Sequence, residues 1–393
     1  MSALEELRLH GYDGTDLKPL GRLTGLKALF ISRCRRLTTL AGLTKLTNLE
    51  RLNLDDCPSL SNINAIRSMT ALNTVSMRYL GVRTLKPLAT LENLEALTLN
   101  TKSLASLAGL TNLNGLKTLD IHEAGGLKTW KPLTGLTGLT TLSISHGAQT
   151  AAPVGDFPNL TEFSMHYTRR MRDISGVAGM PNLSKLSLWY CPVTDLTPVQ
   201  KCEKLGTVEM YDCSALADLS PLQNMQRLHT LSITSAPHIT DLAPIGSCTR
   251  LRFLNMTKNG PVQDLAPLAR LTQLQQLHLS GTVADTDYAF VSAMTGLHQL
   301  RLDDHTDLTD LRFLEPLTRL NELYLMGCTG LRDLSPLTKL PGLRSIWLDR
   351  TTVTDLSPLL EMNSLGFVGF SERNLRGVDL EPLKAKGIRV RTG

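Results

Sequence analysis

The chain has 393 residues, of which 42% are hydrophobic, 20% charged and 5% aromatic, enough for several ordinary domains or one long repeat array. Its 41 Lys and Arg residues against 36 Asp and Glu leave a formal charge of +5, which is too dilute for a dedicated nucleic-acid binder. No apolar run approaches the ~18 residues of a membrane-spanning helix, and no signal segment opens the chain. We therefore expect a cytoplasmic protein that binds neither nucleic acid nor a membrane.

One short pattern repeats along the whole chain. It reads LxxLxL, with Val, Ile, Met or Phe replacing some of the leucines, and its copies are 21 to 23 residues apart. A period of this size indicates a solenoid, in which each repeat is one structural unit stacked on the next. The 17 copies begin at Leu4, Leu26, Leu49, Leu72, Leu94, Leu116, Leu139, Leu160, Leu183, Leu205, Leu228, Leu251, Leu274, Leu297, Leu320, Leu343 and Leu365.

Each repeat is predicted to hold one short strand and one turn. Its last apolar positions alternate with polar ones, as in Leu52-Asn53-Leu54, which is typical of a strand with one buried face. Further on, several repeats carry Asp-Leu-x-Pro before another apolar residue, where the Asp can cap a short helical turn and the Pro fits its first turn. These turns are predicted at 195–199, 218–222, 241–245, 264–268, 333–337 and 355–359.

A repeat of 21 to 23 residues leaves no room for a long helix. We therefore expect an α/β solenoid: a right-handed horseshoe or arc of about 17 repeats, with one parallel sheet on its concave side and short 3₁₀ or α turns on its convex side. Units such as LNELYLMGCTGLRDLSPLTKLPG at 320–342 resemble the short bacterial leucine-rich repeats of internalins. The Cys-containing variant is similar to repeat arrays at the C-termini of actinobacterial NACHT-type signalling ATPases.

The chain is interpreted as one leucine-rich repeat domain, 1–393, with unlike ends. Residues 1–370 hold the regular repeats, and an irregular stretch near 145–160 indicates either a bend or a deletion. Residues 371–393 form a degenerate capping segment, in which 387–390 can add a last partial strand. Because no polar cap precedes the first repeat, we expect a C-terminal part of a larger protein, with an upstream domain of the same chain at its N-terminal edge.

All seven cysteines fall on predicted core positions, as does Trp130, which replaces the Leu of a turn. Cys34 and Cys57 would lie on adjacent repeats, as would Cys191 and Cys213. The sequence is therefore compatible with disulfides between them as well as with the reduced state. No His or Cys spacing suits a metal, and no nucleophile or phosphate-loop motif occurs. We expect no enzymatic activity, no metal and no cofactor.

Functional residues are predicted on the concave face. In a repeat written L1-x2-x3-L4-x5-L6-x7-x8, positions 3, 5 and 7 point away from the core, and most carry small polar residues. A central cluster of aromatic and charged residues departs from this background, and a second ladder follows at position 5. The central cluster comprises His122, His166, Tyr167, Trp189, Tyr190, Glu209 and Tyr211; the second ladder comprises His278, Arg301, Tyr324 and Trp347.

These side chains have two interpretations. Aromatic residues and Arg on a solvent face are typical anchors of protein interfaces. Alternatively, they only cover a curved sheet by stacking on their neighbours. The first interpretation predicts a non-catalytic protein–protein recognition module with its protein ligand on the concave face.

The resemblance to NACHT-type proteins implies a more specific role. The chain would be the ligand-sensing domain of an intracellular bacterial NLR-like signalling or defence protein, in which ligand binding releases or assembles an upstream ATPase. The alternative is an internalin-like surface protein for adhesion and host interaction. The absence of an export signal and the core cysteines favour the first role.

Overall fold

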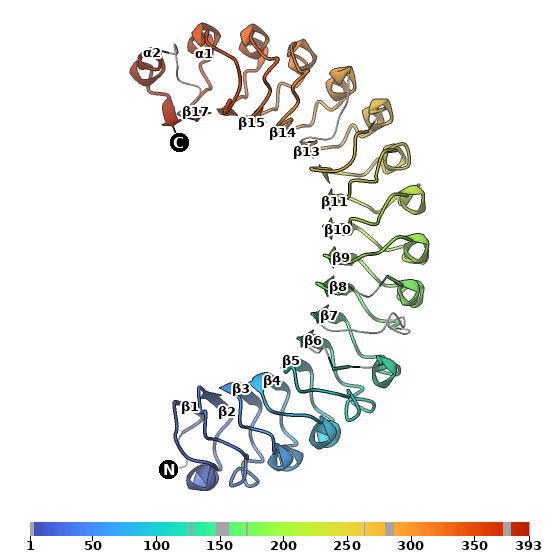
Figure 1. Cartoon of the computed structure of the whole chain (residues 1–393), viewed down its shortest axis with the longest axis vertical. Helices are drawn as coiled ribbons and strands as arrows, with labels where there is room; N and C mark the ends of the chain where they lie inside the picture. The colour runs from blue at the N-terminus through green and yellow to red at the C-terminus, as the bar shows by residue number, and fades with distance from the viewer. Residues whose placement is uncertain are drawn as a thin grey trace. The chain divides into compact units, whose positions relative to one another are not determined.

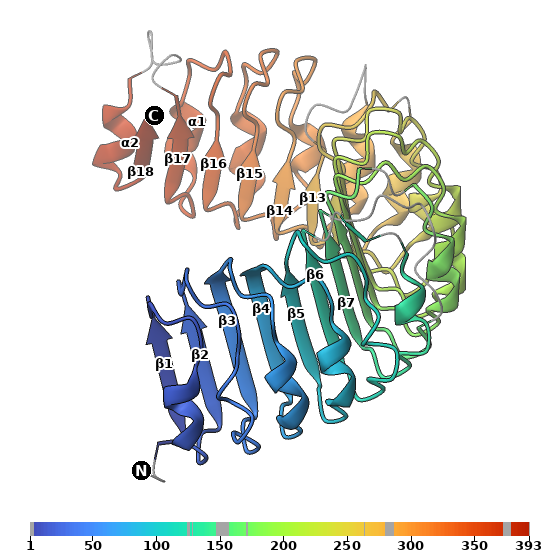
Figure 2. The ribbon, with the colours of Figure 1, turned by 60° about the horizontal axis from the view of Figure 1, so that its bottom comes forward.

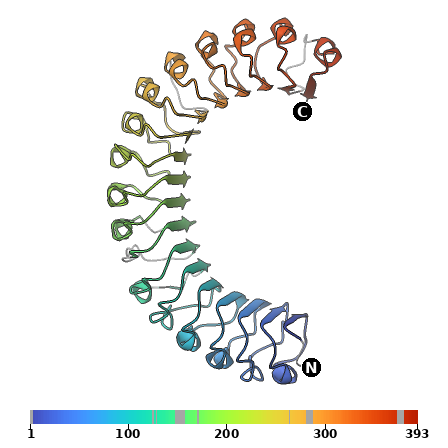
Figure 3. The same cartoon turned by 180° about the vertical axis from the view of Figure 1, so that it is seen from behind.

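The computed structural model describes residues 4–123, 126–127, 129–146, 157–169, 172–262, 264–279, 287–371 and 379–392. The chain divides into two compact units, Met1–Lys204 and Leu205–Gly393. Within each unit the strands lie side by side along the inner side and the helical turns along the outer side (Figure 1; seen from behind in Figure 3). No helix among the described residues is long and apolar enough to cross a membrane.

The described residues contain eighteen parallel strands, of which β1 to β9 form the sheet of the first unit and β10 to β18 that of the second; their chain order within each unit can be followed in Figure 2. The 17 repeats supply β1 to β17, and the predicted partial strand is confirmed as β18, which pairs with β17. The first unit contains β1 Glu6–His10, β2 Ala28–Ser32, β3 Arg51–Cys57, β4 Thr74–Leu80, β5 Ala96–Asn100, β6 Thr118–His122, β7 Thr141–Ser145, β8 Glu162–His166 and β9 Lys185–Trp189. The second unit contains β10 Thr207–Tyr211, β11 Thr230–Thr234, β12 Phe253–Asn255, β13 Gln276–His278, β14 Gln299–Arg301, β15 Glu322–Tyr324, β16 Ser345–Trp347, β17 Phe367–Phe370 and β18 Arg389–Thr392.

Short helical turns return the chain between strands, as predicted. Those described in the first unit are the 3₁₀ turns η1 Lys18–Arg22, η2 Asn64–Ser68, η3 Lys86–Thr90, η4 Lys131–Leu133, η5 Ser175–Gly179 and η6 Thr197–Lys201. Those described in the second are η7 Ser220–Leu222, η8 Ile245–Ser247, η9 Ala266–Arg270, η10 Tyr288–Ala293, η11 Arg312–Leu314 and η12 Ser335–Lys339, with the α-helices α1 Ser357–Glu361 and α2 Glu381–Ala385.

The predicted phase of the strands is confirmed. In β11, Leu231 and Ile233 are fully buried, while Ser232 between them is only partly covered. Leu231 stands opposite Leu254 of β12, so core leucines stack on core leucines along the sheet. This register fixes which side chains reach the outer face of the strands, because a slip of one residue would turn them all inward.

The recurring Asp of the turns lies one residue before the helix N-cap. Asp195 lies before the N-cap residue Leu196, and its Oδ1 accepts a hydrogen bond of 2.7 Å from the backbone N–H of Thr197. The expected capping of these turns is therefore corrected to an Asx-type turn, in which the carboxylate binds the N–H two residues on. Pro lies in the first turn as predicted. Asp287 is different, since it is itself the N-cap of η10 and accepts from Ala289 N.

The seven cysteines are all buried, as predicted, and all are free. Position 9 of the repeat, just after the strand, carries five of them, and their thiols donate to backbone carbonyls: Cys34 to Ser32 at 3.3 Å and Cys328 to Leu302 at 3.0 Å. Asn259 occupies the same position, and its Nδ2 donates to Ile233 O at 2.8 Å. Position 9 therefore satisfies carbonyls where the chain leaves the sheet.

Trp130 is only 1% exposed, which confirms its predicted place in the core. Residues 147–156 of the predicted irregular stretch and 372–378 of the predicted capping segment lie outside the described residues. The rest of the capping segment contains α2 and β18, so it extends the repeat pattern by one short rung.

Candidate functional site

Two columns of aromatic side chains stand at the ends of the last strands of the first unit. The inner column is at position 7, where His166 of β8 is paired in register with Trp189 of β9. Their rings stack with centroids 4.9 Å apart and planes 28° apart. Trp189 is 41% exposed. The parallel register places equivalent positions side by side, which explains why residues 23 positions apart in sequence meet here.

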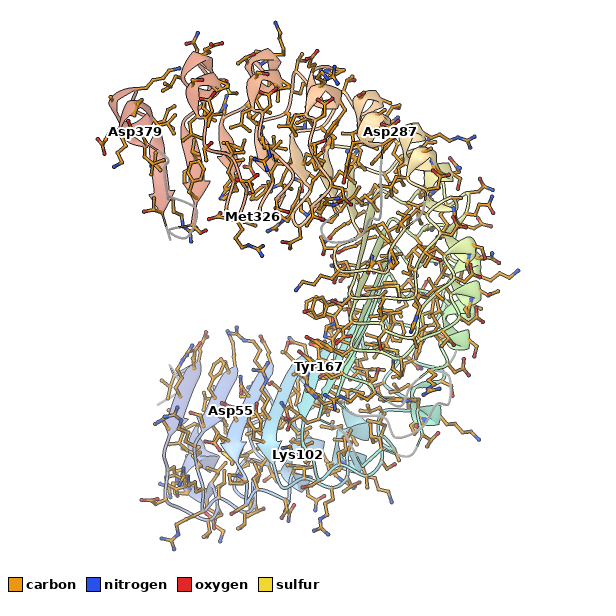
Figure 4. All side chains as sticks on the ribbon, turned by 45° about the horizontal axis from the view of Figure 1, so that its top comes forward. Asp55, Lys102, Tyr167, Asp287, Met326 and Asp379 are labelled. Atoms are coloured by element: carbon orange, nitrogen blue, oxygen red, sulfur yellow. The ribbon has the colours of Figure 1, made fainter. Side chains whose placement is uncertain are left out.

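The outer column is at position 8, where the chain turns out of the strand. His146, Tyr167 and Tyr190 have φ values of 52°, 56° and 54°, the left-handed conformation that ends each strand. Tyr167, labelled in Figure 4, stacks on His146 at 4.5 Å and 6° and on Tyr190 at 4.5 Å and 11°. We name the set of both columns the first aromatic surface: His146, His166, Tyr167, Trp189 and Tyr190.

His122 lies in the same row but apart from these stacks. It ends β6, and Ser145 of β7 stands between it and His166 in the register. Its Nδ1 shares a hydrogen bond of 2.7 Å with Ser145 Oγ. His122 therefore extends the row as a hydrogen-bonded polar group, not as part of the aromatic stack.

The other two members of the predicted central cluster belong to the second unit. Glu209 and Tyr211 are positions 5 and 7 of β10, and Tyr211 is 42% exposed. Both therefore lie on the strand face of that unit, as the sequence predicts.

The predicted second ladder is in register in the second unit, and three of its four members stack. His278, Arg301, Tyr324 and Trp347 are partners in register across β13 to β16. The Arg301 guanidinium lies 5.1 Å from the centre of the Tyr324 ring, and the Tyr324 and Trp347 rings are nearly parallel at 3.9 Å. We name Arg301, Tyr324, Trp347 and Phe367 the second aromatic surface.

Phe367 and Gly369 complete this stack, although sequence analysis missed both. The Phe367 ring lies 5.2 Å from Trp347. Gly369 is the register partner of Trp347, and a Cβ there would lie 2.8 Å from the indole. The glycine therefore leaves the space that the indole fills. His146 was missed too, and the spacing of position 8 through 146, 167 and 190 is the signal that could have found it.

A polar network holds the second aromatic surface in place. Gln299 donates from Nε2 to Glu322 at 2.8 Å, and the Tyr324 hydroxyl donates to the same carboxylate at 3.1 Å. Burial, together with the Glu322 charge, raises the pKa of Tyr324. Arg301 donates to Asp303, a residue only 4% exposed. The rings are thus fixed before any ligand arrives, which lowers the entropy lost on binding.

The chemistry of these surfaces is that of contact and stacking. Burial raises the pKa of the Cys57 and Cys202 thiols to about 11 and that of Cys328 to about 12, so these thiols stay protonated and poorly nucleophilic near neutral pH. Within the described ranges, no group of three His, Cys, Asp or Glu side chains could hold a metal ion. Planar rings and an oriented guanidinium suit aromatic, apolar or planar groups of a partner.

No family model and no curated protein matches the sequence. Three solved structures resemble the fold. An internalin from Listeria monocytogenes has 21% identity and a TM-score of 0.54, with 93% of this chain and 87% of that chain covered. A leucine-rich repeat protein of Leptospira interrogans has 17% identity and a TM-score of 0.66, covering 88% and 96%. TLR13, in complex with ssRNA13, has 17% identity and a TM-score of 0.66, covering 91% of this chain and 58% of TLR13.

These likenesses define the fold. The chain has a leucine-rich repeat fold, structurally similar to the solenoids of a bacterial internalin and of another bacterial leucine-rich repeat protein.

Proposed function

We propose that this chain is a non-catalytic module that recognises a partner protein through the strand face of its repeats. The first aromatic surface carries the proposal: its five rings are stacked in two columns, with Tyr167 39% and Trp189 41% exposed. Rings held rigidly at a surface provide large contact area with little loss of side-chain freedom, as in many interface anchors. The second aromatic surface is the alternative binding site.

The competing ligand class is nucleic acid, because the similar TLR13 structure is a complex with ssRNA13. Nucleic-acid binding depends on cations that neutralise phosphates. Among the outward positions 3, 5 and 7 of β7, β8 and β9 there is one Lys, Lys185, and no Arg, and position 3 of β8 is Glu162. Positions 5 and 7 of these strands hold Ser143, Ser145, Ser164, His166, Ser187 and Trp189. A protein ligand therefore suits the first aromatic surface better.

The specific role follows from the resemblance to NACHT-type proteins. In this proposal the chain senses a ligand inside a bacterial cell for an NLR-like signalling or defence protein, and ligand binding controls an upstream ATPase. Seven buried free thiols support a reducing compartment. An upstream reading frame encoding a Walker-type ATPase would support this role, whereas a signal peptide followed by a helical cap would support the internalin-like adhesin instead.

The test is binding by the aromatic variants. A partner captured from lysate of the source organism is identified by mass spectrometry, purified, and titrated with Trp189→Ala. Loss of an aromatic anchor that the partner buries is expected to weaken binding by about 30-fold or more. Tyr79→Ala is the control, because Tyr79 is 53% exposed and lies on β4, four strands from β8 of the first aromatic surface. Equal affinity of wild type, Trp189→Ala and Tyr79→Ala for the partner would refute the proposal. So would capture of RNA instead of a protein, if nuclease treatment abolished that capture.

A further inference from the structure

A row of arginines follows the rim of the second unit where its strands begin. We name it the strand-start rim. In each of the six repeats from Leu228 to Leu343, it comprises the two residues before the first leucine and the one residue after it. These positions hold five Arg, two His and no Asp or Glu. Backbone bonds stack them in order, since Arg252 N donates to His229 O at 2.9 Å and His298 N to Gln275 O at 2.8 Å. The arginines are Arg227, Arg250, Arg252, Arg319 and Arg344.

In the nine repeats from Leu4 to Leu183 of the first unit, the same positions hold four Glu, two Lys and no Arg. There Lys27 Nζ lies 2.8 Å from Glu5 Oε1, and Lys117 Nζ lies 2.7 Å from Glu95 Oε1. In the second unit, by contrast, no guanidinium of the strand-start rim has a hydrogen bond or ion pair with another described residue. A row of like charges without counter-charges repels itself, so the fold gains nothing from it.

A cavity of about 500 Å³ opens within this rim. Arg252, His298 and Arg319 line it together with three threonines, two glutamines and a glycine of the same repeats, and no carboxylate is part of the lining. Guanidinium groups bind carboxylates through two parallel hydrogen bonds, and hydroxyl and amide groups supply further donors. The lining therefore suits an anionic ligand.

The spacing of the cations describes that ligand more closely. Arg252 and Arg319 lie three repeats apart, which corresponds to roughly 14 Å along the sheet. A ligand that reaches both must be extended and carry several negative groups. None of the residues that line the cavity is Phe, Tyr or Trp, and its one ring is the imidazole of His298. Proteins that bind single-stranded nucleic acid stack successive bases on several aromatic rings, so a run of Asp and Glu side chains fits better.

We infer that the strand-start rim of the second unit binds an acidic peptide segment of a partner protein, seated in the cavity between Arg252 and Arg319. The segment lies along the rim, and Arg227, Arg250 and Arg344 extend the positive surface on both sides. This contact is independent of the two aromatic surfaces, which occupy other positions of the repeats. It adds a charged contact to the apolar one that the proposed function requires.

The test uses the full chain and a fluorescein-labelled oligoglutamate peptide, with binding followed by fluorescence anisotropy at several salt concentrations. Wild type is expected to bind the peptide with an affinity that falls as salt rises. The double variant Arg252→Gln/Arg319→Gln should bind at least about tenfold more weakly, because it loses both charged contacts. Its melting temperature should not fall, since neither guanidinium has a hydrogen-bond or ion-pair partner among the residues that the structure describes.

The matched control is Arg332→Gln/Lys339→Gln, which removes two exposed charges from the same unit away from the cavity. It should bind the peptide like wild type, as should Trp189→Ala. Equal weakening in both double variants would show unspecific charge attraction and overturn the inference. Tighter binding of an oligothymidylate of equal charge would overturn it in favour of nucleic acid. No salt-dependent binding by wild type would also overturn it, while leaving the proposal for the aromatic surfaces intact.

Discussion

At position 9 of the repeat, different side chains make the same hydrogen bond to a backbone carbonyl. Cys34, Asn259 and His305 each donate a hydrogen bond to a backbone carbonyl at the end of a strand. Spacing alone identified the cysteines as a group, because they share one residue type. His305 was not recognised as their equivalent, since its role depends on which carbonyl its imidazole faces.

The thiols provide a prediction at this scale. All seven cysteines are buried, and burial raises the pKa of Cys57 to about 11. Native protein should therefore react slowly with a thiol reagent near neutral pH, whereas denatured protein should release seven thiols in a timed colorimetric assay. Fewer than seven in denaturant without reductant would reveal a bridge such as Cys34 to Cys57.

A neighbouring pair of residues tests the strand phase. Leu231 is fully buried, so Leu231→Ala should lower the free energy of unfolding by about 2–5 kcal/mol through the cavity it leaves. Ser232 is partly covered and accepts a bond of 3.2 Å from Asn255 Nδ2, so Ser232→Ala should cost about 1 kcal/mol or less. Denaturant titration measures both, and similar shifts of the midpoint would contradict the assigned phase.

The secondary-structure elements could be predicted from the sequence where a short local pattern determines them. Alternation of apolar and polar residues is enough to place β11 and to orient Trp189 outward, because a strand has a period of two. The stacking of side chains was harder to predict from the sequence. Gly369, on the strand next to Trp347, leaves space for the indole, and no local sequence pattern indicates this. The Asp195 turn was predicted one residue out of place, because an Asx turn and a helix cap use the same residue types.

The η10 segment supports a pH prediction. His305 Nε2 donates to Leu279 O, and its Nδ1 accepts from the Tyr288 hydroxyl at 2.6 Å. Burial lowers the pKa of His305, partly offset by that backbone bond and by Asp303. In the unfolded chain this histidine takes up a proton near pH 6.5, whereas in the folded chain it does so only at lower pH. Between these two pKa values the unfolded chain binds more protons than the folded one. The free energy of unfolding therefore falls as pH drops below about 6.5.

The variant for this test is His305→Asn, which places at position 9 the residue already present as Asn259. It can keep the carbonyl contact but cannot titrate. Thermal unfolding of the variant should therefore lose less stability than wild type between about pH 7 and pH 5.5. Identical slopes for the two proteins would assign the acid sensitivity to other groups, of which His278 is one, since burial lowers its pKa too.

At the scale of the molecule, the repeat separates folding from recognition. Positions 1, 4, 6 and 9 build the core, and positions 3, 5 and 7 form the strand face. In the second unit, the residues around the first leucine form the strand-start rim. Because each repeat packs on its neighbours, a surface can change along the solenoid while the core stays constant. The composition argument that a charge of +5 is dilute holds for the whole chain, but it overlooks the local row of arginines in the second unit.

Trp189 and Trp347 decide which surface binds the partner. Trp189 is 41% exposed, so Trp189→Ala should hardly change the melting temperature while it weakens partner binding about 30-fold. Trp347 is half-buried between Tyr324 and Phe367, so Trp347→Ala should lower the free energy of unfolding by about 1–3 kcal/mol and leave affinity nearly unchanged. Calorimetric titration and thermal unfolding of both variants separate these effects. If Trp189→Ala and Tyr211→Ala keep full affinity while Trp347→Ala loses it, the second aromatic surface is the binding site.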